Sequence, residues 1–99
     1  MNAQVSLKDQ VLSLVGELTF ANAANIYQQG QRLLLQQSST RMTIDLAGLT
    51  HSNTLTLAVV VQWIRGLPKT QVRLVHVPEK LAAIMRASSL EGLIDSAVA

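Results

Sequence analysis

The stretch from residue 42 to residue 67 constrains the fold of this chain more than any other segment. It opens with apolar residues at alternating positions, the pattern of a buried β-strand, and these are Met42, Ile44 and Leu46. We expect this strand to end at Gly48 and a polar turn to follow. An apolar segment then runs to about Arg65, ahead of a glycine and a proline that mark the end of a helix. Its consecutive valines are weak helix formers, but the segment is too long for one strand, so we predict a strand, a turn and a helix.

The residues before this unit predict a hairpin and a first helix. Residues 3–8 alternate apolar and polar side chains, and residues 11–15 are denser in apolar ones, with a short polar turn between the two. Thr19 is the expected N-cap of the helix that follows. Gly30 lies on the buried face of that helix, where a close approach to a strand would explain a glycine. The other residues of this face recur at helical spacing and are Ala23, Ile26, Tyr27, Leu33 and Leu34.

The residues after the unit predict a fourth strand and a third helix. Over residues 72–77 the side chains of Val72, Leu74 and His76 alternate with those of Arg73, Val75 and Val77, as in a strand. We place His76 on the more polar face of this strand. Pro78 suits the first turn of the next helix. The apolar residues of segment 90–94 are expected to dock on the core. The predicted buried face of the third helix consists of Leu81, Ile84 and Met85.

Together these elements predict an α/β fold. The expected order is strand, strand, helix, strand, helix, strand, helix, with a right-handed parallel connection through the second helix. We expect one domain over residues 1–99. Its small mixed β-sheet has about four strands, and its three helices lie mainly on one face.

The composition points to a protein partner. The chain has 99 residues, of which 48% are hydrophobic and only 14% are charged, against about 25% charged residues in typical soluble domains. A small apolar domain with so little charge often buries part of its surface against another protein. The basic residues are scattered and the net charge is +2. Because nucleic acids require a clustered basic patch, we expect no nucleic-acid partner.

The sequence also limits where the protein can work. Cysteine is absent, which excludes disulfides, thiolate zinc sites and cysteine nucleophiles and fits a reducing compartment. The first ten residues lack the apolar core of a signal peptide. The longest apolar run, residues 57–61, has five residues, far fewer than the roughly 18 that span a bilayer. We therefore expect a cytoplasmic protein that does not insert directly into the membrane.

Candidates for catalysis and metal binding are few. Asp45, His51 and Ser52 are the residue types of a catalytic triad, but triads are recognised by geometry, and no G-x-S-x-G elbow is present. The simpler interpretation is that Asp45 accepts hydrogen bonds from loop amides and that His51 is an exposed loop residue. His51 and His76 are the only histidines, too few for a metal site, and the dispersed glycines form no phosphate-binding loop. We expect no catalytic, metal-binding or cofactor-binding residues, and hence no enzyme.

The polar cluster His51-Ser52-Asn53-Thr54 has two interpretations. Ser52 or Asn53 can cap the helix by accepting hydrogen bonds from the free amides of its first turn. Capping needs only one residue, and the remaining hydroxyls at a helix N-terminus can contact a partner or accept a phosphoryl group. Trp63, on the same helix, is either a core residue or a residue at the rim of a partner interface.

This cluster and the strand before it resemble the signature of STAS domains, the sulfate transporter and anti-sigma factor antagonist domains. In that family a strand ending in Asp-Leu leads through a short loop to Asp-Ser-Ser-Gly or Asp-Thr-Gly-Gly, which opens an apolar helix. Here the strand carries Ile44-Asp45-Leu46. The family's Asp, first Ser or Thr, second Ser and Gly fall at Asn53, Thr54, Leu55 and Thr56. The later strand, helix and tail also match the family's order of elements, so the resemblance implies a STAS-like fold over nearly the whole chain.

Leu55 departs from one branch of this family. In the anti-sigma factor antagonists a partner kinase phosphorylates the residue at this second Ser position, and leucine cannot accept phosphate. The threonine kept at the first position, Thr54, is similar to the stand-alone STAS subunit of the phospholipid ABC transporter that maintains outer-membrane lipid asymmetry. That likeness implies a non-catalytic cytoplasmic subunit, peripheral to the inner membrane, without a cofactor.

The same resemblance implies its partners. The subunit would bind the transporter's ATPase subunit, in a complex that also holds permease and substrate-binding subunits, and would support assembly or activity. The implied contact residues lie in the polar turn and at the helix start, and they are His51, Ser52, Asn53, Thr54 and Thr56. The alternative is an anti-sigma factor antagonist regulated by phosphorylation, with Thr54, Ser52 or Thr56 as the acceptor.

Overall fold

The computed structural model describes residues 2–37, 40–67 and 69–87 of the chain. Within them four strands form one sheet in the order β1-β2-β3-β4, with the bounds Ala3–Lys8, Val11–Gly16, Arg41–Leu49 and Gln71–Val75. The three helices of the described residues are α1 (Ala23–Leu35), α2 (Thr54–Arg65) and α3 (Glu79–Ala87). The predicted order of elements and the predicted fold class are confirmed.

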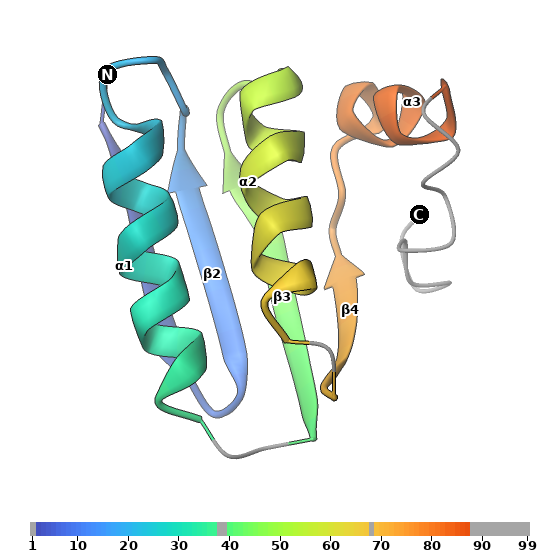
Figure 1. Cartoon of the computed structure of the whole chain (residues 1–99). Coiled ribbons are helices and arrows are strands. Elements are labelled where there is room, and N and C mark those ends of the chain that lie inside the picture. Colours follow the sequence, from blue (N-terminus) through green and yellow to red (C-terminus); the bar gives the residue numbers. More distant parts are fainter. Residues whose placement is uncertain (1, 38–39, 68, 88–99) are drawn as a thin grey trace.

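The sheet is mixed, as predicted. β1 and β2 form an antiparallel hairpin, in which Asp9 and Gln10 have positive φ angles of 52° and 68°. Two successive left-handed residues are typical of a tight type I′ turn, whose twist matches that of the strands. β3 is parallel to both β2 and β4. In Figure 1 the connection from β3 through α2 to β4 passes in front of the sheet and moves rightward while the strands run upward, which is the expected right-handed sense.

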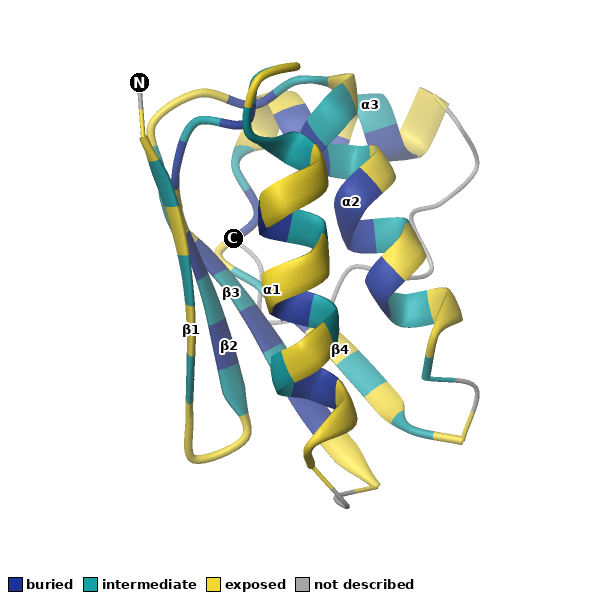
Figure 2. Cartoon of the chain, turned by 60° about the vertical axis from the view of Figure 1, so that its left-hand side comes forward, coloured by how far each residue is buried: buried dark blue, intermediate teal, exposed yellow. Residues whose placement is uncertain are grey.

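The helices α1 and α2 lie side by side over one face of the sheet, and α3 lies near the end at which the parallel strands finish (Figure 1). Figure 2 shows the buried residues on the inward sides of α1 and α2 and the exposed ones on their outward sides. The strands contribute fully buried side chains at alternating positions, which is why the sequence alternation predicted them. These side chains are Leu12, Leu14, Ile44, Leu46 and Leu74.

Trp63 joins the two helices. Its side chain is 1% exposed, and its Nε1–H donates a hydrogen bond to the backbone oxygen of Tyr27 in α1, at 2.9 Å. Gly30 makes room for the indole ring, because a Cβ atom there would lie 2.3 Å from Trp63 Cζ2. Trp63 is therefore a core residue and does not lie at the rim of an interface. The expected approach of Gly30 to a strand is wrong, because the close neighbour is the side chain of a second helix.

Two predicted boundaries are also wrong. Thr19 does not cap α1; Asn22 occupies that position, and its Oδ1 accepts a hydrogen bond from the backbone N–H of Thr19, at 2.8 Å. Gly48 does not end β3, which continues to Leu49. The pairing of β2 with β3 shifts register at this level, and a Cβ atom on Gly48 would lie 2.7 Å from Val15 Cγ2. The glycine therefore accommodates an irregularity inside the sheet.

His76 lies outside the strand in which it was predicted. β4 ends at Val75, and His76 has a φ angle of 56°, a left-handed conformation that turns the chain toward α3. In α3 the buried residues are Leu81, Ala82 and Met85, while Ile84 is only half-buried. The apolar tail segment 90–94 lies outside the described residues.

Candidate functional site

Asn53 organises the polar turn ahead of α2. Its backbone is extended, with φ −153° and ψ −179°, and its Oδ1 accepts a hydrogen bond from the backbone N–H of Thr56, at 3.0 Å. Its Nδ2 donates to the backbone oxygen of Leu18, at 3.1 Å. The first bond is the predicted helix cap. The second ties the start of α2 to the loop between β2 and α1, so both loops are held at one end of the molecule.

The residues predicted for partner contact differ in exposure. Thr54 and His51 are exposed, and Asn53 is half-buried by its role in the turn. Ser52 is 7% exposed and Thr56 is fully buried. Among the described residues, no fully buried side-chain nitrogen or oxygen lacks a hydrogen-bond partner. Ser52 and Thr56 are thus part of the interior of the turn, whereas the side chains of Thr54 and His51 reach the surface.

Phe20 is an exposed residue beside this turn that the sequence reasoning did not select. It lies in the β2–α1 loop and its side chain is 93% exposed. The loop is bound to the turn by the Asn53–Leu18 hydrogen bond and by a contact of 3.6 Å between His51 Nδ1 and Glu17 Oε1. Because aromatic residues are enriched in protein interfaces, Phe20 is a further candidate for contact with a partner. The sequence held one signal that could have identified Phe20. It is a large apolar residue between a predicted strand and a predicted helix, and it fits the apolar spacing of neither element.

The structure does not assemble the candidate triad. Asp45 Oδ1 lies 3.0 Å from Nδ1 of His76, not beside His51, and it also accepts a hydrogen bond from the backbone N–H of Ala47 at 2.9 Å. Asp45 thus accepts a backbone hydrogen bond, but the donor lies within β3 and not, as was expected, in a loop. Burial raises the pKa of Asp45, but the Ala47 bond and the bond and charge of His76 bring it below its ordinary value overall. The residues that the structure describes contain no group of three or more side chains suited to hold a metal.

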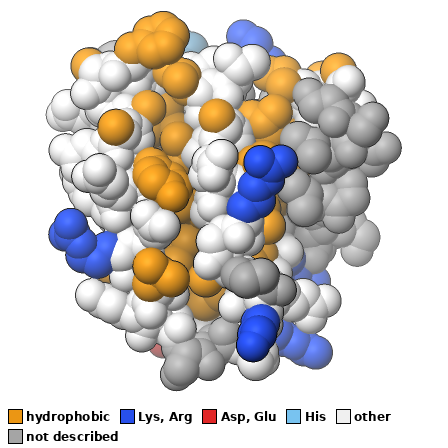
Figure 3. Space-filling view, viewed as in Figure 1, with side chains coloured by type: hydrophobic (Ala, Val, Ile, Leu, Met, Phe, Trp, Pro, Cys, Tyr) orange, Lys and Arg blue, Asp and Glu red, His pale blue; other side chains and the backbone are white. Residues whose placement is uncertain are grey.

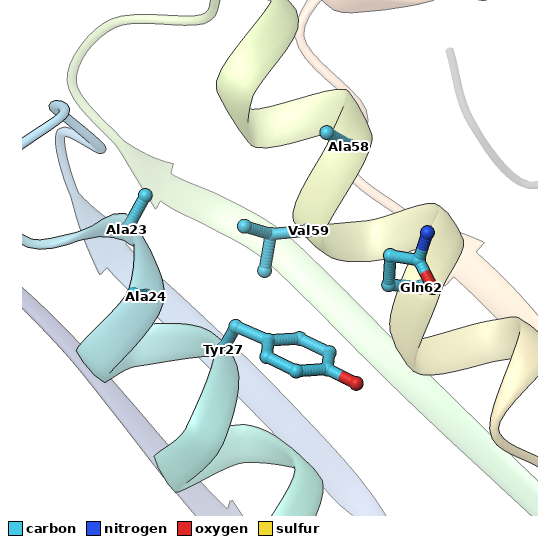
Figure 4. Close-up of a pocket in the computed structure, with 6 residues that line it drawn as sticks. All are labelled: Ala23, Ala24, Tyr27, Ala58, Val59 and Gln62. Atoms are coloured by element: carbon cyan, nitrogen blue, oxygen red, sulfur yellow. The ribbon is translucent and has the colours of Figure 1, made fainter.

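An apolar groove runs between α1 and α2. It encloses about 330 Å³ and is lined by Ala23, Ala24, Tyr27, Ala58, Val59 and Gln62 (Figure 4). Figure 3 shows hydrophobic side chains along the line where the two helices meet. A second, more polar hollow of about 450 Å³ lies on the other side of α1, beside β1. Across the described parts of the chain, no helix combines the length and the apolar character that crossing a bilayer demands.

The fold is a four-stranded mixed sheet with two helices on one face and a capped turn after β3. This is the arrangement that the resemblance to STAS domains predicted. The family model described as "MlaB, STAS domain" matches residues 1–95, and the chain belongs to this STAS family.

The more particular likeness is to chains of the Acinetobacter MlaFEDB complex. In one ATP-bound conformation of that complex, a chain is 38% identical, with a TM-score of 0.83, 93% of this chain covered and 98% of the other. In a second conformation the TM-score is 0.79 at the same 38% identity, with 92% and 95% covered. The unphosphorylated anti-sigma factor antagonist SpoIIAA shares the fold, with 16% identity, a TM-score of 0.75, and 95% and 86% covered. No curated protein matches the chain significantly.

Proposed function

We propose that this protein is the non-catalytic STAS subunit of a phospholipid-transporting ABC transporter and binds the transporter's ATPase subunit. The observation that carries the proposal is the 38% identity, over nearly the full length of both chains, to a chain of the MlaFEDB complex. In this function the subunit works at the cytoplasmic face of the inner membrane, held there by a complex that includes permease and substrate-binding subunits. It supports assembly or activity of the ATPase in maintaining outer-membrane lipid asymmetry.

The exposed side chains at the start of α2 supply the contact. Thr54 is the first residue of the helix, and its position is fixed because Asn53 bonds both to the first turn and to the neighbouring loop. A preformed surface loses little conformational freedom on binding, which favours affinity. His51 and Phe20 lie on the loops that flank Thr54 and widen the surface. Ser52 and Thr56 contribute by holding the turn in shape from within.

Replacing Thr54 tests the proposal. Thr54→Arg places a long charged side chain at the centre of the contact, so we expect co-purification with the ATPase subunit to be lost. Because Thr54 is exposed, the isolated domain should keep the circular dichroism spectrum and thermal midpoint of the wild type. Thr40→Arg is the matched control, since Thr40 is also exposed but precedes β3 at the opposite end of the sheet. Undiminished co-purification of Thr54→Arg would contradict the proposed contact.

The alternative, a phosphorylated anti-sigma factor antagonist, rests on the exposed hydroxyl of Thr54 at a helix N-terminus, where the helix dipole favours a phosphate. Ser52 and Thr56 are buried, so a kinase would meet only Thr54. Incubation with the cell's anti-sigma kinases and ATP, followed by intact mass measurement, separates the two functions. A mass gain that disappears in Thr54→Val would favour the alternative.

A further inference from the structure

The groove between α1 and α2 has no role in the function proposed above. We propose that it receives an apolar segment of the ATPase subunit, so that the contact surface extends from Thr54 along the length of α2. This inference rests on the proposed function, because it takes the ATPase subunit as the partner, and it adds a second contact that Thr54 does not by itself require.

The walls of the groove select an apolar, uncharged occupant. Three of its six lining residues are alanines, whose small side chains leave the hollow between the helices. Val59 is only 7% exposed, and its side chain points into the space between the helices (Figure 4). The polar groups at the walls are uncharged, contributed by Tyr27 and Gln62. A charged side chain would find no opposite charge among these lining residues, whereas an aliphatic or aromatic side chain would bury apolar surface.

The groove is preformed. The buried side chain of Trp63 in α2 donates its hydrogen bond to the backbone oxygen of Tyr27 and fits against Gly30, both in α1. Both contacts fix the distance between α1 and α2. A partner segment therefore enters a hollow that exists before binding and does not need to separate packed helices.

The position of the groove identifies its occupant. Thr54, Ala58 and Gln62 follow one another at intervals of four residues, so they form a single line along the surface of α2. All three are exposed. A subunit that covers Thr54 and continues along α2 reaches Ala58 and Gln62 next, and these are walls of the groove. The same partner therefore accounts for both contacts, and a second copy of this chain or a lipid acyl chain is not needed to fill the groove.

Charging one wall of the groove tests the inference. Ala24 is exposed and lies in the first turn of α1, so Ala24→Glu is compatible with folding and even favourable to the helix dipole. We expect its affinity for the purified ATPase subunit to fall by about tenfold or more, because a carboxylate in the groove would have to lose its water. Gln29→Glu is the matched control: it adds the same charge to the same helix, about 140° around the axis, and should bind like the wild type.

The possible outcomes separate the two proposals. If the wild type binds the ATPase subunit and Ala24→Glu binds equally well, the groove proposal is wrong and the proposed function stands. If the wild type itself does not bind, both are wrong. If sedimentation shows that the isolated wild type self-associates and Ala24→Glu does not, the groove pairs two copies of this chain and the inference is overturned.

A photocrosslinking experiment gives an independent measurement. The chain has no cysteine, so Ala24→Cys can carry a single benzophenone label in the groove. Within the assembled transporter we expect this label to crosslink to the ATPase subunit, and a label at Gln29→Cys to give little or no product. Crosslinking from position 24 to the permease, to lipid or to a second copy would overturn the choice of occupant.

Discussion

Gly30 and Trp63 fit together so closely that the effect of a side chain at position 30 can be argued from geometry. In an ordinary helix interior, alanine is more stable than glycine by about 1 kcal/mol. Here the added Cβ would fall 2.3 Å from the indole ring, and an extra methyl group in a packed core costs about 1–3 kcal/mol. The helix gain offsets part of this cost, so we expect Gly30→Ala to lower the free energy of unfolding by up to about 2 kcal/mol, as measured by urea denaturation.

Gly66→Ala is the matched control for this substitution. Gly66 follows the last turn of α2 with a φ angle of −75°, and a Cβ atom there would meet its nearest neighbours at 3.4 and 3.5 Å. Both values are ordinary van der Waals contacts, so the stability of Gly66→Ala should stay close to that of the wild type. Equal stability of Gly30→Ala and Gly66→Ala would mean that the indole can move aside without loss.

Asp45 should make the thermal stability of the domain depend on pH. Its carboxylate accepts a hydrogen bond from Ala47 and lies against His76, and its pKa is lowered overall from 3.8 although burial alone would raise it. Because folding then favours the ionised form, the stabilisation is fully present above pH 3.8 and is lost as the pH falls through the lowered pKa. Asp45→Asn should therefore lower the thermal midpoint at neutral pH. The difference from wild type should shrink as the pH falls below 3.8, and a difference that does not vary with pH would contradict the argument.

At the scale of single elements, the start of α2 depends on one side chain. Asn53→Ala removes the acceptor for the N–H of Thr56 and the donor to the backbone oxygen of Leu18. Loss of an N-cap typically costs about 1 kcal/mol. Because the bond to Leu18 is lost as well, we expect the free energy of unfolding, measured by chemical denaturation, to fall by about 1 kcal/mol or more.

Asn53→Asp separates the two bonds of this residue. Aspartate keeps the cap and is favourable at a helix N-terminus, but it cannot donate to Leu18. Its loss of stability should therefore be smaller than that of Asn53→Ala. If the two variants were equally destabilised, the bond to the β2–α1 loop would outweigh the cap.

The elements that sequence reasoning predicted correctly are those whose signal is local. The strands were predicted from the alternation of apolar residues in the sequence. The cap was predicted because Asn53 lies only three residues before its partner Thr56. The errors arose where a distant part of the chain decides the conformation. Gly48 is explained by a register shift against β2, and Gly30 by the indole of Trp63 in another helix.

In the candidate site, too, the features set by neighbouring residues were predicted and those set by distant residues were not. The capped turn with Thr54 at its end followed from neighbouring residues and from the resemblance to STAS domains. The burial of Ser52 and Thr56 could not be predicted, because it depends on how the turn packs against the rest of the fold. The pairing of Asp45 with His76 required the two parallel strands to be aligned in space.

At the scale of the whole molecule, the exposed residues of the proposed contact lie together at one end. Phe20, His51 and Thr54 lie on two loops and a helix start that are joined by the bonds of Asn53 and by the contact of His51 with Glu17. The groove begins nearby, at the first turn of α1 and the second turn of α2. One partner surface can therefore cover all of them at once.

Phe20 tests whether this end of the molecule is the interface. Its side chain is 93% exposed, so Phe20→Ser removes almost no buried surface from the isolated domain, and the thermal midpoint should not fall. An aromatic anchor in a protein interface is worth about 2 kcal/mol, so affinity for the ATPase subunit should fall by about tenfold or more. Leu35→Ser is the control, because Leu35 is 61% exposed at the opposite end of α1. Both substitutions exchange an exposed apolar side chain for serine. If the interface lies at the Thr54 end, only Phe20→Ser should weaken binding. Equal weakening in the two variants would mean a general effect of lost surface hydrophobicity and would contradict this interface.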